Sequence, residues 1–338
     1  MNSHIPNNKE LGKTMNLLKI GAFILISAAS HLSFSTVLVD PSIMAESENG
    51  VFMDNGRYFV AGSSGIQEVK SYTDNSSNCQ QDSSGKTVCT LVEANLNGNQ
   101  CFYSSLTTDN YYLYATCTVW KDGLLGTFQE PEYAAFLRIL PGSSQADQVI
   151  VHEFDQPVWY NGMTMLDNDS ILMTQSVSSQ GSGNSAIVKL DITNQLTADF
   201  TISDWLPSSI FYLNPNGVKY ENGYVYFVGG QNLFRIPVRW NQTAGIPILM
   251  YQTTVNEMLD DFTIVGDWLA IAEVALINGT GTNNVTFVHK HGWISPFKVF
   301  TGFLQLSSLA VDPGTLTYAG DLIGTSYYQG GLYRIPMP

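Results

Sequence analysis

The sequence predicts an all-β protein, a six-bladed β-propeller with four antiparallel strands in each blade, and three observations support this. Charged residues make up only 13% of the 338 residues, while aromatic residues reach 12%, with 29 Gly and 13 Pro. Short apolar runs bounded by Gly, Asn, Asp or Pro follow one another along the chain, as expected for strands joined by turns. These runs recur about every fifty residues, which is the length of chain that a four-stranded blade requires.

Six runs give the clearest strand signal, and they begin at residues 58, 112, 171, 225, 269 and 322. They are Tyr58-Phe59-Val60, Tyr112-Leu113-Tyr114, Ile171-Leu172-Met173, Val225-Tyr226-Phe227, Leu269-Ala270-Ile271 and Leu322-Ile323. Aromatic and β-branched residues favour strands. We therefore expect residues 36–338 to form one propeller domain with one such strand in each blade.

A second repeated pattern precedes several of these strands. In "ENGVFMDNGRYFVAG", "YNGMTMLDNDSILMTQ" and "PNGVKYENGYVYFVGG", a head of Asn-Gly and an apolar residue comes before a polar turn and a buried strand. These heads begin at Asn49, Asn161 and Asn216. "DDFTIVGDWLAIAEV" has the same layout with Asp260-Asp261 at its head, and "SSLAVDPGTLTYAGDLIGTS" is a looser copy. We expect each head to begin an innermost strand, with the later strand as its antiparallel partner.

The stretch "NPNGVKYENGYVYFVGG" contains two Asn-Gly pairs with different expected roles. Asn222-Gly223 stands where a hairpin turn belongs, because both residue types tolerate the positive φ of a type I′ turn. Asn216-Gly217 comes one strand earlier, where the innermost strand begins. Asn216 is therefore a candidate site residue.

Innermost strands line the central channel of a propeller, so heads from distant parts of the chain are expected to converge there. The expected set is Glu48, Asn161, Asn216 and Asp261. Two carboxylates and two amide oxygens suit Ca²⁺ better than Mg²⁺, which prefers to keep several waters, and they suit copper or iron poorly. Glu46 is an alternative to Glu48, and Asp260 to Asp261. Any one of these residues alone would be explained as a turn former or cap.

These heads resemble those of the gluconolactonase, senescence-marker-protein (regucalcin) and luciferin-regenerating-enzyme family of six-bladed propellers, from about Glu46 to Ile335. "PNGVKYENGYVYFVGGQNLFRIPV" looks like that family's Asn-Gly blade, and "LDDFTIVGDWLAIA" looks like its Asp blade. In such proteins a Glu, two Asn and an Asp hold a divalent cation at the channel mouth. They fall on Glu48, Asn161, Asn216 and Asp261. The family's usual Pro-Asp-Gly is replaced here by Asp260-Asp261-Phe262, and its Gly-Glu-Ser-Pro by Ser47-Glu48-Asn49-Gly50.

The resemblance implies a metal-dependent hydrolase, because most family members open lactones or cleave related esters. Ca²⁺, or another divalent cation such as Mg²⁺, Zn²⁺ or Mn²⁺, would polarise the lactone carbonyl. Asp261 would be the catalytic carboxylate that accepts a proton from the attacking water. Asn161 would bind the substrate or complete the coordination shell. The expected partner is a small-molecule substrate, possibly a sugar lactone.

Two other functions stay open, because the fold alone does not decide between them. One is a secreted propeller without catalysis that binds a ligand or a protein and keeps Ca²⁺ only for structure. It differs from a hydrolase in whether a coordination position on the ion is open to substrate. The other is an enzyme of the strictosidine-synthase type, which would need a hydrophobic pocket and a general base.

The N-terminus has the three parts of a secretory signal. Lysines precede the apolar run "IGAFILISAA", and small residues follow it. We expect a signal peptide in residues 1–35, cleaved near residue 30 or 35, and export of the propeller to the extracellular space or the periplasm. The apolar run is too short to span a bilayer comfortably, so no membrane association is expected in the mature form.

The chain has four cysteines, Cys79, Cys89, Cys101 and Cys117. An even, clustered set in an exported chain predicts two disulfides, for which three pairings are possible. The local pairing Cys79–Cys89 would close the polar loop "CQQDSSGKTVC", and Cys101–Cys117 could then join neighbouring strands. The spacings do not match a zinc ribbon.

The chain is acidic, with a formal net charge of −14 and a pI of about 4.6. A protein of this charge repels phosphate backbones and anionic lipid headgroups. We therefore expect no nucleic-acid partner.

Overall fold

The structure of the protein is a computed structural model that describes residues 35–120, 131–178, 185–208, 214–275, 283–302 and 304–337, without the side chains of 177 and 178. The expected signal peptide lies outside the described residues, apart from Ser35. In the described part of the chain, no helix is long and apolar enough to cross a membrane.

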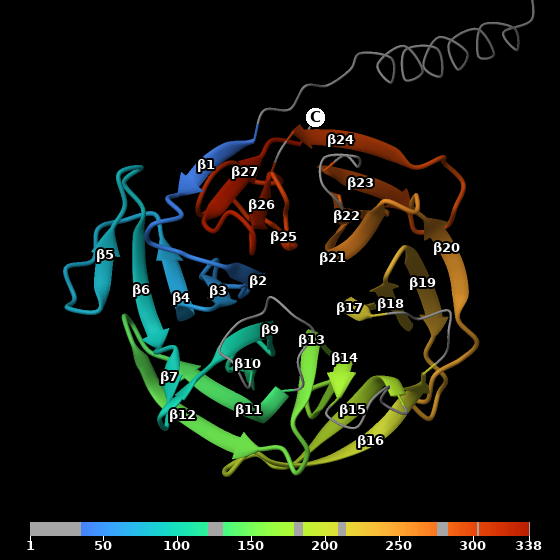
Figure 1. The fold of residues 1–338 in the computed structure, drawn as a ribbon, viewed down its shortest axis with the longest axis horizontal. Coiled ribbons are helices and arrows are strands. Elements are labelled where there is room, and N and C mark those ends of the chain that lie inside the picture. Colours follow the sequence, from blue (N-terminus) through green and yellow to red (C-terminus); the bar gives the residue numbers. More distant parts are fainter. Residues whose placement is uncertain are drawn as a thin grey trace, which may run out of the picture.

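The strands form six antiparallel sheets that stand as blades around a central axis (Figure 1). This confirms the predicted six-bladed β-propeller. Blade 1 contains, from the axis outward, β2 (Ser47–Phe52), β3 (Tyr58–Gly62), β4 (Gly65–Lys70), β6 (Thr87–Val92) and a fifth strand, β5 (Cys79–Gln81). A small hairpin of β7 (Asn95–Leu96) and β8 (Asn99–Gln100) leads to blade 2.

Blades 2 to 5 have four strands each, in chain order from the axis outward. Blade 2 contains β9 (Phe102–Thr108), β10 (Leu113–Trp120), β11 (Pro131–Pro141) and β12 (Ala146–Glu153). Blade 3 contains β13 (Val158–Met165), β14 (Ser170–Ser178), β15 (Ser185–Asn194) and β16 (Asp199–Pro207). Blade 4 contains β17 (Pro215–Glu221), β18 (Tyr224–Gly229), β19 (Asn232–Pro237) and β20 (Ile248–Gln252). Blade 5 contains β21 (Glu257–Val265), β22 (Trp268–Ala275), β23 (Asn283–His289) and β24 (Phe297–Gly302).

Blade 6 is built from both ends of the domain. Its inner strands are β25 (Ser308–Val311), β26 (Leu322–Thr325) and β27 (Leu332–Ile335), and its outer strand is β1 (Thr36–Val39). Val37 pairs with Tyr333 in an antiparallel register, and Figure 1 shows blue β1 beside red β27. This pairing closes the ring and covers the outer edge of β27, which would otherwise be open to pairing with other chains.

The second strand of each blade is the apolar run that the sequence predicted. Residues 58–62 of β3 and 113–120 of β10 are buried throughout, because neighbouring blades cover both faces of these strands. Apolar clusters fill the spaces between blades. Phe59 of blade 1 and Leu113 of blade 2, for example, belong to one cluster.

The turn between β17 and β18 has the predicted hairpin conformation. Asn222 has a φ of 51° and Gly223 a φ of 82°, as a type I′ turn requires. Asn216-Gly217 has no such conformation and lies inside β17. The two Asn-Gly pairs therefore lie in different structures, a hairpin turn and an innermost strand, as the sequence indicated.

Both disulfides are present with the local pairing. Cys79 and Cys89 lie opposite each other on β5 and β6, with their Cα atoms 4.0 Å apart. Cys101, just before β9, is bonded to Cys117 of β10, with a Cα–Cα distance of 5.2 Å. The first bond holds the outermost strand of blade 1, and the second joins the two inner strands of blade 2.

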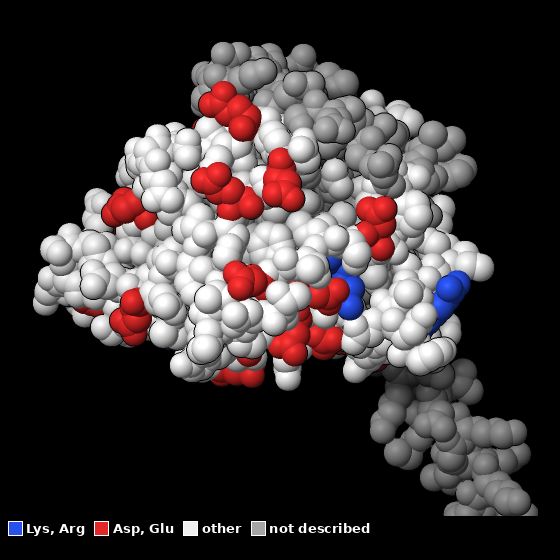
Figure 2. Space-filling view, turned by 90° about the horizontal axis from the view of Figure 1, so that it is seen from below, with Lys and Arg blue, Asp and Glu red and all other residues white. Residues whose placement is uncertain are grey.

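The surface carries the excess of acidic residues that the composition implies. Figure 2 shows Asp and Glu side chains scattered over one side of the molecule, with few Lys or Arg among them. On this side the acidic groups do not gather into a single patch.

Candidate functional site

The inner strands of blades 1 to 5 each contain a β-bulge at the same level of the channel. In blade 3, for example, Asn161 and Gly162 together oppose the single residue Thr174 of β14. In blade 6, the corresponding pair stands at the start of β25. The six pairs are Glu48-Asn49, Ser104-Ser105, Asn161-Gly162, Asn216-Gly217, Asp260-Asp261 and Ser307-Ser308. Bulges re-aim side chains, and they are common next to functional sites.

The first residues of the six pairs form what we call the bulge ring. Its members are Glu48, Ser104, Asn161, Asn216, Asp260 and Ser307. The ring contains Glu48, Asn161 and Asn216, which were predicted from sequence. In blade 5 the register places Asp260, the alternative to Asp261, in the ring. Asp261 is one residue further on, in register with Gly162 and Gly217.

Contacts between blades show that ring side chains meet. Asn216 donates a hydrogen bond through Nδ2 to Oδ1 of Asp260 in the next blade. Ser307 of blade 6 is hydrogen-bonded to Glu48 of blade 1. Glu48 is 8% exposed and Asp260 is 5% exposed, so both carboxyl groups are largely shielded from bulk water.

Two of these carboxyl groups bind protons unusually tightly. Burial, followed by the negative charge of Asp261, raises the pKa of Glu48 to about 8, although the hydrogen bond from Ser307 opposes this. Burial and the charges of Glu48 and Asp261 also raise the pKa of Asp260. A raised pKa means that the negatively charged form of each carboxyl group is disfavoured. A nearby positive charge would stabilise that form, so the site favours either a bound proton or a positively charged ligand.

Asn161 brings an amide group to the same level of the channel. The residue as a whole is 4% exposed, and its amide makes no hydrogen bond to any residue in the described part of the chain. Its amide atoms are not among the buried polar atoms that lack a partner, so solvent reaches them. The amide is therefore accessible to a ligand beside two buried carboxyl groups.

The carboxylate of Asp261 is bonded by two residues of other blades and fits into space left by a third. Nζ of Lys219 lies 3.2 Å from each of its carboxylate oxygens, and Nδ2 of Asn49 donates to Oδ2 at 3.3 Å. A Cβ atom on Gly217 would lie 2.0 Å from Oδ1 of Asp261. Glycine is therefore required at position 217 to make room for this carboxylate.

Two tyrosines stand close to the ring. Burial and the charges of Asp260 and Glu48 raise the pKa of Tyr328. Burial and the charges of Glu46 and Glu48 raise the pKa of Tyr327 to about 12. Their phenol groups therefore lie near the acidic side chains and remain neutral, as hydrogen-bond donors.

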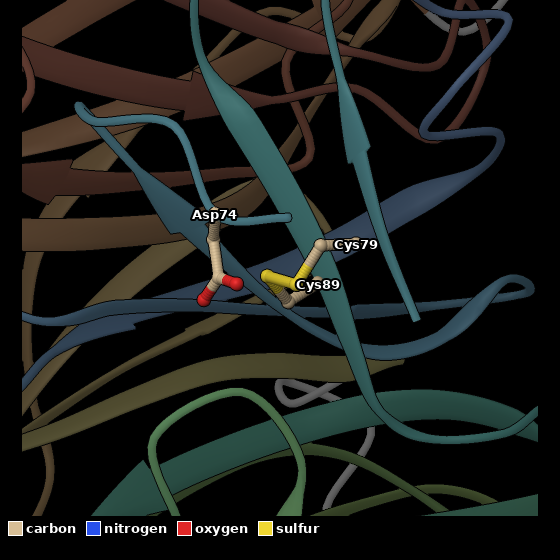
Figure 3. Close-up of side chains that lie close together, drawn as sticks. All are labelled: Asp74, Cys79 and Cys89. Atoms are coloured by element: carbon tan, nitrogen blue, oxygen red, sulfur yellow. A yellow bond between two sulfur atoms is a disulfide. The ribbon is translucent and has the colours of Figure 1, made fainter. Parts of the chain in front are cut away.

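The ring suits a cation with oxygen ligands. Glu48 and Asp260 offer carboxylate oxygens, and Asn161 and Asn216 offer amide oxygens, which are ligands that Ca²⁺ accepts. Within the described residues, one group of three His, Cys, Asp or Glu side chains comes within metal-binding distance, namely Asp74, Cys79 and Cys89 (Figure 3). The two sulfur atoms of that group are bonded to each other, so they are not available to a metal.

Sequence reasoning did not find Ser104 or Lys219 as parts of this region, and it placed Asn49 at a strand head without giving its side chain a role. Ser104-Ser105 precedes the strand signal of blade 2, and its resemblance to Ser307-Ser308 could have indicated it. Lys219 has no such signal, because its partner Asp261 lies 42 residues away in the chain.

The chain matches no protein-family model and no curated protein sequence. Solved structures with a similar fold include a putative oxidoreductase (glucose dehydrogenase) from Thermus thermophilus, with 13% identity, 90% of this chain and 100% of that chain covered, and a TM-score of 0.55. A streptogramin B lyase has 11% identity, coverage of 90% and 98%, and a TM-score of 0.52. A chain of a nidogen/laminin complex has 11% identity, coverage of 80% and 85%, and a TM-score of 0.53. At these identities the similarity shows that the propeller fold is shared, and nothing about function follows from it.

Proposed function

We propose that this protein is a hydrolase that uses a divalent cation, best Ca²⁺, to open a lactone. The observation that carries the proposal is the bulge ring, in which the amide of Asn161, without a hydrogen bond to any described residue, lies at one level with the buried carboxyl groups of Glu48 and Asp260. Glu48, Asn161, Asn216 and Asp260 would hold the cation. When bound, the cation supplies a Lewis acid that polarises a carbonyl group.

The register supports Asp260 rather than Asp261 as the reactive carboxylate. Oδ1 of Asp260 accepts the hydrogen bond of Asn216, while Oδ2 accepts none from the described residues. Both oxygens of Asp261 are engaged by Lys219. In the proposed reaction, Oδ2 of Asp260 takes a proton from water as the water oxygen bonds to the lactone carbonyl carbon. The ring C–O bond then breaks, and the proton passes to the leaving alkoxide.

The other ring residues have positioning roles in this proposal. Asn216 orients Asp260 through its hydrogen bond. Asn161 would bind the cation through its amide oxygen, which leaves Nδ2 to donate to the substrate, because Nδ2 has no partner among the described residues. The phenol of Tyr328, kept neutral beside Asp260 and Glu48, is a donor suited to a substrate hydroxyl or to the developing oxyanion.

We also propose that the protein acts outside the cytoplasm. Two disulfides and no free cysteine in the described residues are typical of exported proteins, because cytosolic thiols are kept reduced. This agrees with the signal expected in residues 1–35.

The test is lactone hydrolysis by purified residues 36–338, measured by pH-stat on aldonolactones and aliphatic lactones, with Ca²⁺ and then with EDTA. We expect lactone turnover that EDTA abolishes and Ca²⁺ restores. In Asp260→Asn the turnover rate should fall by about a hundredfold or more. Bound Ca²⁺ without turnover on any lactone would contradict the hydrolase and favour a ligand-binding propeller.

A further inference from the structure

The ion pair beside the bulge ring is unusual for a metal site, because it places a fixed ammonium group on a carboxylate that could bind the metal. Lys219 is three residues beyond Asn216 on β17, and its Nζ contacts both oxygens of Asp261 at 3.2 Å. The side chain of Asp261 is 4% exposed and that of Lys219 is 23% exposed.

Several parts of the fold fix this ion pair in place. Gly217 of blade 4 leaves the space that the carboxylate occupies, and Asn49 of blade 1 donates to Oδ2. The ammonium group of Lys219 also lies 5.9 Å from the centre of the Phe262 ring. Because Asp261 is buried, breaking the pair would leave an uncompensated charge, which is far more costly than breaking a surface pair.

A divalent cation in the bulge ring would therefore compete with Lys219 for Asp261. To bind Asp261, the cation would have to displace an ammonium group of like charge from a buried carboxylate. Asp260, by contrast, has one oxygen without a partner among the described residues. Asp260 and Asp261 are therefore similarly buried, but only Asp260 has a carboxylate oxygen that is open to a cation.

We propose that Lys219 keeps Asp261 out of the coordination shell, so that the cation keeps an open position for a substrate oxygen. The inference rests on the proposed function and deepens it. Ca²⁺ takes six to eight oxygen ligands, and four side chains leave positions to be filled by water or substrate. In zinc proteins, catalytic sites keep such a position, whereas structural sites are closed by protein ligands, and we apply the same distinction here. Lys219 is thus a positioning residue that weakens metal binding and keeps the site open.

The test is Ca²⁺ titration by calorimetry on residues 36–338, comparing the wild type with Lys219→Met and Lys219→Met/Asp261→Asn. Lys219→Met removes the repelling charge and frees Asp261, so we expect Ca²⁺ to bind at least about tenfold more tightly. The double variant restores the local charge balance, so its affinity should lie within about threefold of the wild type. Lys189→Met is the matched control, because Lys189 pairs with Asp191 on β15 and its loss changes the net charge equally.

A second measurement counts water on the metal. Tb³⁺ replaces Ca²⁺, and its luminescence lifetime in H₂O and D₂O gives the number of bound waters. We expect Lys219→Met to have at least one water fewer than the wild type. The double variant contains no buried unpaired charge and should fold even if Lys219→Met does not, which thermal melts would show.

The outcomes separate the inference from the proposed function. Unchanged or weaker Ca²⁺ binding in folded Lys219→Met would overturn the inference while leaving a metal site in place. Binding in the double variant that is weaker by about tenfold or more would also overturn it, because Asp261 would then be a ligand. Absence of Ca²⁺ and Tb³⁺ binding in the wild type and in every variant would overturn the metal site itself.

Discussion

Asn216 and Asp260 lie on neighbouring blades and are joined by a hydrogen bond from Nδ2 to Oδ1. This orientation leaves the amide oxygen of Asn216 without a partner among the described residues, beside a carboxylate that also has an oxygen to spare. One contact thus supplies two oxygen donors of different charge. It also links two bulges that are 44 residues apart in the chain.

Ca²⁺ bound beside the Asn216–Asp260 hydrogen bond should stabilise the folded protein. A ligand that binds only the native state stabilises it by about 2.7 kcal/mol at a hundred times its Kd. We therefore expect Tm to rise with Ca²⁺ and to fall with EDTA, as followed by circular dichroism. Asn161→Ala and Asn216→Ala should each lose most of this Ca²⁺-dependent shift, whereas Asn99→Ala, in the β7–β8 hairpin, should keep it. An equal shift in all three variants would place the ion elsewhere.

Stability without metal should fall as the pH rises. The pKa of Glu48 is about 8 in the folded protein and ordinarily 4.5, so the folded state holds the proton more tightly than the unfolded state. Between these two values the free energy of unfolding should decrease by about 1.4 kcal/mol per pH unit for this proton. The raised pKa of Asp260 acts in the same direction.

Urea denaturation in EDTA at several pH values between 5 and 8 measures this slope. Glu48→Gln should make the curve flatter, because it removes one of the titrating groups. Saturating Ca²⁺ should also flatten the curve, since a bound cation stabilises the charged carboxylates. Stability that increases over this pH range would show that the buried carboxyl groups are already compensated within the chain.

Thr174 connects two bulges and should be costly to replace. Its hydroxyl accepts a hydrogen bond from the backbone N–H of Gly162 at 2.7 Å and donates one to the carbonyl of Asn216. Thr174→Val keeps the shape but leaves these buried groups unpaired, so we expect a loss of about 1–3 kcal/mol in urea denaturation. Thr174→Ser retains the hydroxyl and is the control. A loss below about 0.5 kcal/mol in the Val variant would mean that the bulges do not depend on this bond.

Much of the fold could be predicted from the sequence because each blade repeats one local pattern. The buried second strands, such as Tyr58–Gly62, are marked by apolar residues and turns, which are local signals. The hairpin at Asn222-Gly223 was predictable for the same reason. The closure of blade 6 by β1 depends on pairing between the two ends of the domain, for which no local signal exists.

The sequence located the candidate site in each inner strand, but it did not always show which of two adjacent residues contributes the side chain. In "LNPNGV" the glycine after Asn216 shows which residue of the bulged pair contributes a side chain to the ring. Asp260-Asp261 has no glycine to make this distinction, and only the register with β22 shows that Asp260 is the ring residue. Lys219 reaches Asp261 across blades, and such a contact arises from tertiary packing alone.

The disulfide of blade 2 should contribute more stability than that of blade 1. Cys101 and Cys117 are buried within an apolar cluster, and their separation of 16 residues corresponds to about 3 kcal/mol of loop entropy. Cys101→Ala/Cys117→Ala should lose at least this much in urea denaturation, because it also leaves space in the core. Cys79→Ala/Cys89→Ala is the control pair, since it releases only the outer strand β5. An equal loss in both pairs would indicate that packing around Cys101 adds nothing.

Closure of the ring by β1 should govern the stability of the whole domain. Val39 is fully buried in the apolar cluster between blades 6 and 1, whereas Val37 on the same strand is 56% exposed. Val39→Ala should therefore lose about 2 kcal/mol in urea denaturation, while Val37→Ala should change stability by less than about 0.5 kcal/mol.

Removal of β1 should make the protein associate. A chain that begins at residue 40 would expose the edge of β27 and should associate, as measured by size-exclusion chromatography, whereas a chain that begins at Ser35 should stay unassociated under the same conditions. If the chain that begins at residue 40 were as stable and unassociated as the one that begins at Ser35, the ring would be held by the contacts between its inner strands, and β1 would be an accessory strand.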